Sequence, residues 1–201
     1  MQIIQQYCEW IVSPPPNTLE ILELIGRVAY KSEERITPGS AEKFLKMILT
    51  KKHESILDHI HATMRFVTNR GISHELVRHR IAAYTQESTR YVNYGKRGMV
   101  VICPCDYDNF NENEASTWIL ANQQAEIAYN HMLSAGSSPQ RARDVLPHSL
   151  KTEVVATWNM REWRHVFSLR LQSNAHPQMV DLMKQALGMF QVAVPILFDE
   201  F

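Results

Sequence analysis

Apolar residues recur along the chain with two periods, and these predict an alternation of helices and strands. Spacings of three and four residues predict helices over residues 17–31, 40–50, 72–81, 113–135, 161–171 and 176–195. Alternation of apolar and polar residues predicts strands over 60–67 and 153–159, with weaker strand patterns over 1–12 and 100–103. The mixture predicts an α+β fold, a single mixed helix/sheet domain over residues 1–201 with more helix than strand.

Residues that stop or start regular structure mark the borders of these elements. Three consecutive prolines at 14–16 end the first strand, and Gly136 ends the longest helix. Asn17, with Glu20 three residues later, and Ser40 after a Pro-Gly turn are predicted helix caps. A further short helix is expected to begin at Ser138 and to end before Pro147.

The stretch from 78 to 91 contains the densest group of side chains suited to binding an anion. It reads Arg-His-Arg-Ile-Ala-Ala-Tyr-Thr-Gln-Glu-Ser-Thr-Arg-Tyr. Arginine offers a planar fork of donors that matches phosphate oxygens, and Gln86 and Ser88 add neutral donors. The stretch therefore predicts a receptor for phosphate esters, with a solvated basic face as the alternative. If residues 78–80 end a helix, they point about 100° apart and span a long ligand or serve two ligands.

Composition limits the partners of this stretch. The chain has 201 residues, 45% of them apolar, and a formal net charge of zero. It has no general attraction for nucleic acid or for an anionic membrane, so an anion site must be local. No apolar run approaches the roughly 20 residues of a membrane helix, and the N-terminus lacks the pattern of a secretory signal. Three cysteines are too few for a disulfide framework, which favours a cytoplasmic protein.

Two other groups of residues have weaker chemical meaning. His53, His59 and His61 invite comparison with a metal site, but no quartet of His and Cys follows at zinc spacing, so we expect polar packing or ligand contact and no metal. Cys103 and Cys105 lack the spacing of a redox or zinc pair and are expected to be structural, with a thiol nucleophile as a lesser alternative.

The C-terminal half carries a dispersed set of cations. Arg161, Arg164 and His165 are three to four residues apart and so share a helical face. Arg141, Arg143 and Arg170 lie further away in the sequence. For each residue alone, a surface ion pair is the commoner role.

Taken together, these blocks resemble the flavin-dependent thymidylate synthases. Arg78-His79-Arg80, seven residues, Ser88 and then Arg90-Tyr91 are similar to the signature of that family. The other blocks follow in the family's order between about residue 27 and residue 178: His53-Glu54-Ser55, Asp58-His59, Arg143 with Leu146-Pro147, Asn159-Met160-Arg161, His165, and Arg170 before Ala175-His176-Pro177.

The resemblance implies a homotetramer of α/β subunits with active sites shared between chains. Such an enzyme methylates dUMP to dTMP, with methylenetetrahydrofolate as carbon donor and a hydride from FAD that NADPH has reduced. Position by position, the residues implied to bind FAD are His53, Ser55, Arg78, His79, Arg80, Gln86, Asn159, Met160, Arg161 and His165. Those implied to bind dUMP are Glu75, Leu76, Val77, Arg78, Gln86, Glu87, Ser88, Thr89, Arg90 and Tyr91, with Arg143 and Arg170 from a neighbouring chain.

The resemblance also assigns chemical roles. Arg170 is the expected catalytic residue, because a guanidinium aimed at uracil would stabilise the negative charge that develops there. His53 and Tyr91 are expected near the flavin ring, where folate must stack. Ser88 has no histidine and acid beside it in the sequence, and the cysteines match no family block, so a route without an enzyme-linked pyrimidine is favoured.

Departures and alternatives remain. Gln178 stands where the family often has an acid, Glu75 where some members have glutamine, and His165 where others have asparagine. A related enzyme would add a hydroxymethyl group to the same pyrimidine. From other classes, the chain could be a metal-dependent nucleotide phosphohydrolase using His53, His59 and His61, or a nucleotide-binding module without catalysis.

Overall fold

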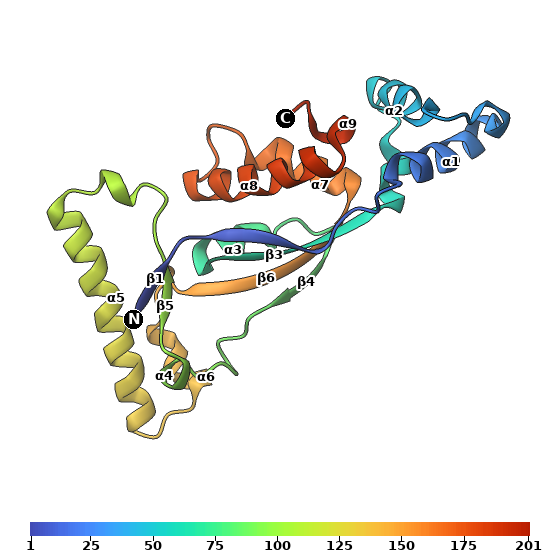
Figure 1. Ribbon diagram of the computed structural model, residues 1–201. Coiled ribbons are helices and arrows are strands. Elements are labelled where there is room, and N and C mark those ends of the chain that lie inside the picture. Colours follow the sequence, from blue (N-terminus) through green and yellow to red (C-terminus); the bar gives the residue numbers. More distant parts are fainter. The chain divides into compact units, whose positions relative to one another are not determined.

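A computed structural model describes residues 1–201, which form two compact units (Figure 1). Unit 1 comprises Met1–Tyr7, Phe66–Arg80 and Tyr84–Val155. Unit 2 comprises Cys8–Arg65, Ile81–Ala83 and Ala156–Phe201. With nine α-helices and six strands, the structure confirms the mixed helix and sheet architecture, while a single domain over 1–201 stays a prediction.

The strands form two sheets. Strands β1 (Gln2–Ile4) and β5 (Val100–Ile102) pair in parallel, with Ile3 opposite Val101. The second sheet has the order β2-β3-β6-β4, made of Tyr7–Val12, His61–Asn69, Lys151–Asn159 and Ala83–Gln86. The predicted single strand over 1–12 is therefore two strands, because the chain changes sheets at Gln5 and Gln6. The buried side chain of Gln6 accepts a hydrogen bond from Thr68 at 3.0 Å at this change.

Unit 1 contains α3 (Arg70–Leu76), α4 (Tyr94–Arg97), α5 (Glu112–Ser134) and α6 (Pro139–Ala142), with a 3-10 turn at Arg143–Val145. A second 3-10 turn spans Tyr107–Asn109. A capping box between Asn111 and Glu114 starts α5, which lies beside α4 and α6 (Figure 1). The core beneath them consists of Tyr94, Met99, Val101, Tyr129, Ala142 and Leu150.

Unit 2 contains α1 (Thr18–Tyr30), α2 (Ser40–Thr50), α7 (Met160–Arg170), α8 (Pro177–Ala193) and α9 (Pro195–Phe198). Its 3-10 turns span Glu33–Arg35 and Glu54–His59. Helix α1 packs against α2, and α8 packs against α7 and α9. The ring of Trp163 lies 4.5 Å from that of Phe190, and Phe190 lies 4.6 Å from Phe198, between ring centroids. Such fully buried aromatic side chains bury large apolar areas and supply much of the stability of the unit.

The helix predicted over 72–81 is correct in type but wrong in extent. Asn69 caps α3 by accepting the N–H of Ile72 at 2.8 Å, and the helix ends at Leu76. Beyond it, the N–H groups of Arg78 and His79 donate to the carbonyls of Glu75 and Leu76 in a tight turn. Residues 78–80 are therefore not helical, and the predicted spacing of about 100° between their side chains does not apply.

Two predicted caps also differ from the structure. Asn17 occupies the N-cap position of α1, but its side chain makes no capping hydrogen bond. Ser40 is the first residue of α2, and the N-cap is Gly39, whose φ of 82° suits glycine. The Ser40 hydroxyl instead donates to the buried carboxylate of Glu23 at 2.7 Å. The short helices α4 and α9 were not predicted, because single turns carry no periodic signal.

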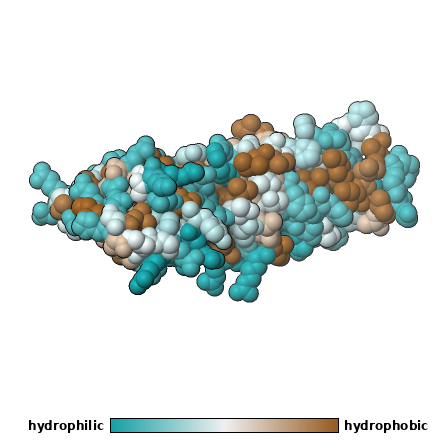
Figure 2. Space-filling view, turned by 90° about the horizontal axis from the view of Figure 1, so that it is seen from below, coloured by the Kyte–Doolittle hydropathy of each residue, from teal (hydrophilic) through white to brown (hydrophobic).

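Large apolar side chains are exposed on parts of both units. Figure 2 shows hydrophobic residues among hydrophilic ones on one face of the molecule. On α1, Leu24 is 54% exposed, Val28 52% and Tyr30 46%, and on α5 Leu120 is 56% exposed. None of the helices combines the length and the hydrophobicity needed to cross a membrane.

Candidate functional site

The segment Arg78-His79-Arg80 is held in place by one phenol. The Tyr84 hydroxyl lies 2.7 Å from the carbonyl oxygen of Leu76 and 2.8 Å from that of His79, so it donates to the main chain on both sides of the turn. His79 is only 5% exposed. Arg78 and Arg80 are exposed, so their guanidinium groups remain available to a ligand.

A small cationic pocket in unit 1, here called the Arg143 pocket, has a volume of about 240 Å³. Its lining consists of Arg70, His74, Thr89, Arg143, Asp144, Leu146, Pro147, His148 and Leu150. The His74 and His148 rings meet edge to face at 6.0 Å, and Arg143 Nε lies 4.0 Å from its one acidic neighbour, Asp144. Two guanidinium groups, two imidazoles and a hydroxyl suit a phosphate. The pocket is lined by both Thr89 and Arg143 of a single chain, whereas the resemblance implied that Arg143 reaches the dUMP site from a neighbouring chain.

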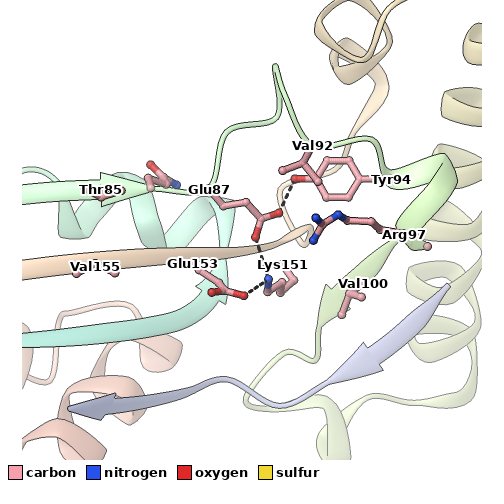
Figure 3. A pocket seen from close by; sticks show the side chains of 11 residues that line it. Thr85, Glu87, Val92, Tyr94, Arg97, Val100, Lys151, Glu153 and Val155 are labelled. Atoms are coloured by element: carbon pink, nitrogen blue, oxygen red, sulfur yellow. Dashed lines mark hydrogen bonds and ion pairs between the residues drawn. The ribbon is translucent and has the colours of Figure 1, made fainter. Parts of the chain in front are cut away.

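A second pocket in unit 1, here called the Glu87 pocket, has a volume of about 510 Å³ (Figure 3). Its lining consists of Thr85, Gln86, Glu87, Val92, Tyr94, Arg97, Gly98, Val100, Lys151, Glu153 and Val155. Glu87, predicted to bind substrate, accepts hydrogen bonds from the Tyr94 hydroxyl and the Lys151 ammonium, each at 2.8 Å. Lys151 also contacts the Glu153 carboxylate.

The ionisation states in this pocket follow from its contacts. Burial lowers the pKa of Lys151, but its hydrogen bonds to Glu153 and Glu87 outweigh that effect and raise it, so the ammonium stays charged. Burial also raises the pKa of Tyr94, and the hydrogen bond to Glu87 adds to the rise, so the phenol stays neutral and donates its proton. Lys151, Tyr94 and Glu153 were not predicted from the sequence as site residues. Alternation in β6, which puts Lys151 and Glu153 on one face, was the available signal.

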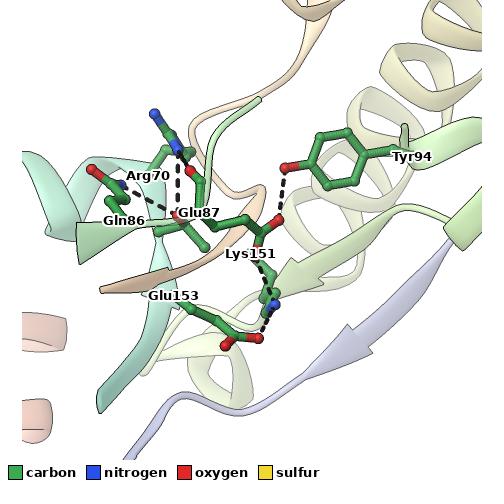
Figure 4. Close-up of polar contacts among 7 residues, drawn as sticks. Arg70, Gln86, Glu87, Tyr94, Lys151 and Glu153 are labelled. Carbon is green, nitrogen blue, oxygen red and sulfur yellow. Dashed lines mark hydrogen bonds and ion pairs between the residues drawn. The ribbon is translucent and has the colours of Figure 1, made fainter. Parts of the chain in front are cut away.

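Gln86 is fixed between α3 and β6 (Figure 4). Its amide nitrogen lies 2.9 Å from Ser73 Oγ and 3.2 Å from Thr152 Oγ1. Arg70 donates to Thr152 Oγ1 at 3.3 Å and to the carbonyl of Glu87 at 3.1 Å. These contacts fix the end of β4 just before the segment that carries Ser88.

The segment after β4 forms a closed turn. The Ser88 carbonyl accepts the N–H groups of Tyr91 at 3.1 Å and Val92 at 3.0 Å, and its hydroxyl accepts the N–H of Arg90 at 3.3 Å. The Arg90 side chain donates to Gln140 at 3.0 Å, and Tyr91 is 77% exposed. No base contacts the Ser88 hydroxyl, which supports its interpretation as a ligand donor rather than a nucleophile.

A pocket of about 450 Å³ in unit 2, here called the Arg161 pocket, lies at the start of α7. Its lining consists of Asp58, Ile81, Asn159, Arg161, Glu162 and His165, so it joins three residues predicted to bind FAD. Asn159 caps α7 by accepting the N–H of Glu162 at 2.8 Å, and Arg161 lies 3.5 Å from Asp58. Burial raises the pKa of the Glu162 carboxyl, and the positive charge of nearby His165 partly opposes this.

Two residues predicted to bind ligands have side chains that face the core. Leu76 and Met160 are 0% exposed. The Leu76 carbonyl is bonded to Tyr84, and the Met160 N–H donates to the carbonyl of Ile60. Their side chains therefore support neighbouring residues and do not contact a ligand in this conformation.

The remaining predicted residues lie at exposed or half-exposed positions. Ser55 is exposed in the 3-10 turn Glu54–His59, Glu75 and Val77 are half-buried at the end of α3, and Arg170 is half-buried as the last residue of α7. His53 Nδ1 lies 2.8 Å from the Tyr30 hydroxyl. His53, His59 and His61 do not bring their ring nitrogens together into a set able to share a metal, which removes the basis of the phosphohydrolase alternative.

Comparisons with known proteins agree with the sequence blocks. Residues 11–196 match the family described as thymidylate synthase complementing protein. The chain is 31% identical to the flavin-dependent thymidylate synthase of Corynebacterium glutamicum over 90% of this chain and 78% of that protein. It is 30% identical to that of Geobacter sulfurreducens over 92% of this chain and 82% of that protein. The fold matches the crystal structure of the UMP/dUMP methylase PolB from Streptomyces cacaoi bound with 5-Br dUMP, with a TM-score of 0.85 and 21% identity, over 100% of this chain and 96% of that one.

Proposed function

The chain belongs to the flavin-dependent thymidylate synthase family, and on that premise we propose that it methylates dUMP to dTMP. In this proposal methylenetetrahydrofolate donates the carbon, and NADPH reduces the FAD. The bound FAD would supply the hydride, and the protein would bind and orient the reactants.

The Arg161 pocket is the observation that carries this proposal, because its donors fit a flavin dinucleotide. The pocket lies at the N-terminus of the 11-residue helix α7, whose dipole favours an anion, although the N–H groups of Met160 and Glu162 are already bonded to Ile60 and Asn159 and the lining includes the carboxylates of Asp58 and Glu162. The Arg161 guanidinium provides a second source of positive charge. Asn159, Arg161 and His165 would therefore contribute to FAD binding in unit 2, as would Ser55, and the family resemblance implies Arg78, His79 and Arg80 as further FAD residues.

In this proposal the Arg143 pocket holds the 5′-phosphate of dUMP. Its cations outnumber its single carboxylate, and a phosphate dianion needs that excess of positive charge. Thr89 lines the pocket, and Ser88 and Arg90 adjoin it in the sequence. Gln86 would then lie near the nucleoside, with its amide group already oriented by Ser73 and Thr152.

The chemical role of the protein would be electrostatic. The uracil C5 is a poor nucleophile until negative charge develops on the pyrimidine, and the Arg170 guanidinium would stabilise that charge where it forms. No side chain needs to attack the pyrimidine, consistent with the lack of a base at Ser88. The exposed side chains of His53 and Tyr91 would be free to meet the folate and the flavin ring.

We also propose a homotetramer with shared active sites. The exposed Leu24, Val28 and Tyr30 of α1 form part of an apolar surface that association would remove from water. A neighbouring chain would then supply part of each site, and Arg170 is the residue expected to come from it.

The visible spectrum of the purified protein tests the proposal first. We expect bound flavin, bleaching by NADPH under anaerobic conditions, and release of tritium from 5-tritiated dUMP when folate is added. The mass of the product separates dTMP from a hydroxymethylated nucleotide. A protein that binds no flavin, or one that holds reduced flavin and dUMP with folate yet releases no tritium, contradicts the proposal.

A further inference from the structure

We propose that Lys151 and Tyr94 act through Glu87 as positioning residues for Ser88, Thr89 and Arg90. This inference rests on the proposed function, in which that segment binds dUMP. It changes the role predicted for Glu87 from substrate contact to internal anchor.

Every polar atom of Glu87 has a partner within the protein. The N–H of Glu87 donates to the carbonyl of Glu153 at 2.9 Å, and its carbonyl accepts from Arg70 at 3.1 Å. One carboxylate oxygen accepts from Tyr94 and the other from Lys151, both at 2.8 Å (Figures 3 and 4). Both the main chain and the side chain of this residue are therefore fixed.

The bond from Tyr94 to Glu87 closes a loop at its base. Strand β4 ends at Gln86 and α4 begins at Tyr94, so the chain between them runs over 87–93. Glu87 is the first residue of this connection, and Tyr94 directly follows its last residue. Tyr94 is 7% exposed and its ring packs edge to face on Tyr129, at 5.9 Å between centroids. The buried Tyr94 ring fixes one end of the loop, and the hydrogen bond from Tyr94 to Glu87 holds its two ends together. The loop therefore loses little conformational entropy when a ligand binds.

The loop presents its residues on two sides. Glu87 faces the Glu87 pocket, whereas Thr89, two residues later, is 9% exposed and lines the Arg143 pocket. The position of Glu87 therefore determines where Thr89 and its neighbours lie.

Lys151 is the cation that makes this arrangement possible. It contacts the carboxylates of both Glu87 and Glu153, which would repel each other without it. The side chain of Glu87 is 15% exposed and that of Glu153 36%, so water screens this repulsion only in part. Removal of Lys151 should turn the Glu87 carboxylate towards solvent and displace the loop. Arginine, also a cation with several donors, should retain the contact with both acids.

The test compares Lys151→Met, Lys151→Arg and Tyr94→Phe in the flavin-loaded enzyme. We expect Lys151→Met to raise the dissociation constant and KM for dUMP about tenfold, because a displaced loop no longer meets the phosphate in the right geometry. The flavin spectrum and kcat at saturating dUMP should stay close to wild type. Lys151→Arg should restore most of the affinity, and Tyr94→Phe, which keeps the buried ring, should show a smaller loss of dUMP affinity.

Glu126→Gln is the matched control. It breaks an ion pair of 2.9 Å in the same unit, between Glu126 and the N-terminal ammonium, with side chains 23% and 5% exposed. We expect this variant to bind dUMP like wild type even if its melting temperature falls.

The inference is overturned if a folded Lys151→Met or Tyr94→Phe enzyme binds dUMP with wild-type affinity. It is also overturned if Lys151→Arg fails to recover affinity, or if Glu126→Gln weakens dUMP binding equally, since either result indicates a purely structural role. Should Lys151→Met not fold, Tyr94→Phe alone decides. A wild-type protein that binds neither flavin nor dUMP contradicts the proposed function as well. An active wild-type enzyme together with a Lys151→Met or Tyr94→Phe variant of unchanged dUMP affinity contradicts only this inference.

Discussion

Tyr84 holds His79 by its main chain: the phenol oxygen lies 2.8 Å from the His79 carbonyl oxygen and also donates to the carbonyl of Leu76, at 2.7 Å. These are carbonyls that a longer α3 would have bonded to its own N–H groups, so the phenol ends the helix before the Arg-His-Arg segment. The exposed guanidinium groups of Arg78 and Arg80 thus extend from a turn whose main chain is held by the Tyr84 hydroxyl.

Tyr84→Phe should weaken flavin binding while leaving the fold intact. Loss of the hydroxyl removes the hydrogen bonding that it gives to the Leu76 and His79 carbonyls, which costs about 1–2 kcal/mol of unfolding free energy and loosens residues 78–80. We expect the FAD dissociation constant to rise severalfold, measured by retention of the visible flavin spectrum after gel filtration and by thermal melting. Tyr7→Phe, at an exposed tyrosine of the same unit, is the control and should retain flavin. Equal flavin binding in both variants would count against a role for this turn.

Arg161→Met should lower FAD affinity by at least about tenfold, because it removes a guanidinium from the pocket at the start of α7. Arg161→Lys should recover only part of the loss, since an ammonium lacks the fork. Titration of the apoprotein with FAD, followed by flavin fluorescence, measures both. Arg35→Met removes a guanidinium from a side chain that is 73% exposed and should not affect FAD.

Arg143→Lys should raise the KM for dUMP about tenfold and change kcat much less, because it removes a bidentate donor from the phosphate without altering the reacting ring. Arg141→Lys, at an exposed arginine two residues earlier, is the matched control. Steady-state kinetics with dUMP as the varied substrate separate the two. Identical KM values for both variants would remove Arg143 from the phosphate site.

Arg170→Lys should reduce turnover while preserving the fold and the bound flavin. A point charge cannot reproduce the fork that would stabilise charge on the pyrimidine, so we expect kcat to fall by about a hundredfold. Tritium release at saturating dUMP measures the loss, and the flavin spectrum reports integrity. Unchanged turnover would exclude the catalytic role.

The cysteines should differ sharply in reactivity. Burial raises the pKa of Cys8 from 9.0 to about 12, with smaller contributions from Asp181 and Glu9. Burial also raises the pKa of Cys103, whereas Cys105 is exposed. Alkylation at about pH 8 should therefore modify Cys105 first, and Cys105→Ser should abolish the fast phase. Rapid labelling of Cys8 in the folded protein would contradict this.

The same shift predicts a pH dependence of stability. The folded state disfavours the Cys8 thiolate, so its contribution to stability is present below the unfolded value of 9.0 and is lost as pH rises towards about 12. Cys8→Ala should flatten the unfolding free energy over that window. Urea titrations at several pH values, with Cys105→Ser as control, measure the difference.

The sequence predicted the long elements because their burial follows one period. In β6, Thr152, Val154, Ala156 and Trp158 are buried and the residues between them are not, as the alternation indicated. The long helices α5, α7 and α8 likewise follow their predicted ranges closely. The end of α3 could not be predicted, because it depends on Tyr84, which is eight residues from Leu76 and held by β4.

The sequence predicted which residues line the candidate pockets better than it predicted the contacts between their side chains. Asn159, Arg161 and His165 line one pocket, and Thr89 and Arg143 line another. Lys151 lies 64 residues from Glu87 in the sequence, and Tyr94 lies seven residues from it. No local sequence pattern predicts that these side chains bond to the Glu87 carboxylate. The sequence therefore predicted a substrate contact for Glu87 and none of its contacts with Lys151 and Tyr94.

The alternating faces of β6 have a consequence for how the family can vary. A one-residue insertion or deletion within this strand would exchange its faces, sending Lys151 and Glu153 inward and the buried tryptophan outward. Asn159, at the C-terminal end of β6, would at the same time move away from the position in which it caps α7. Length changes among related sequences should therefore be absent from 151–159 and accumulate in connections such as 103–111, where the chain can grow or shrink without turning a strand over.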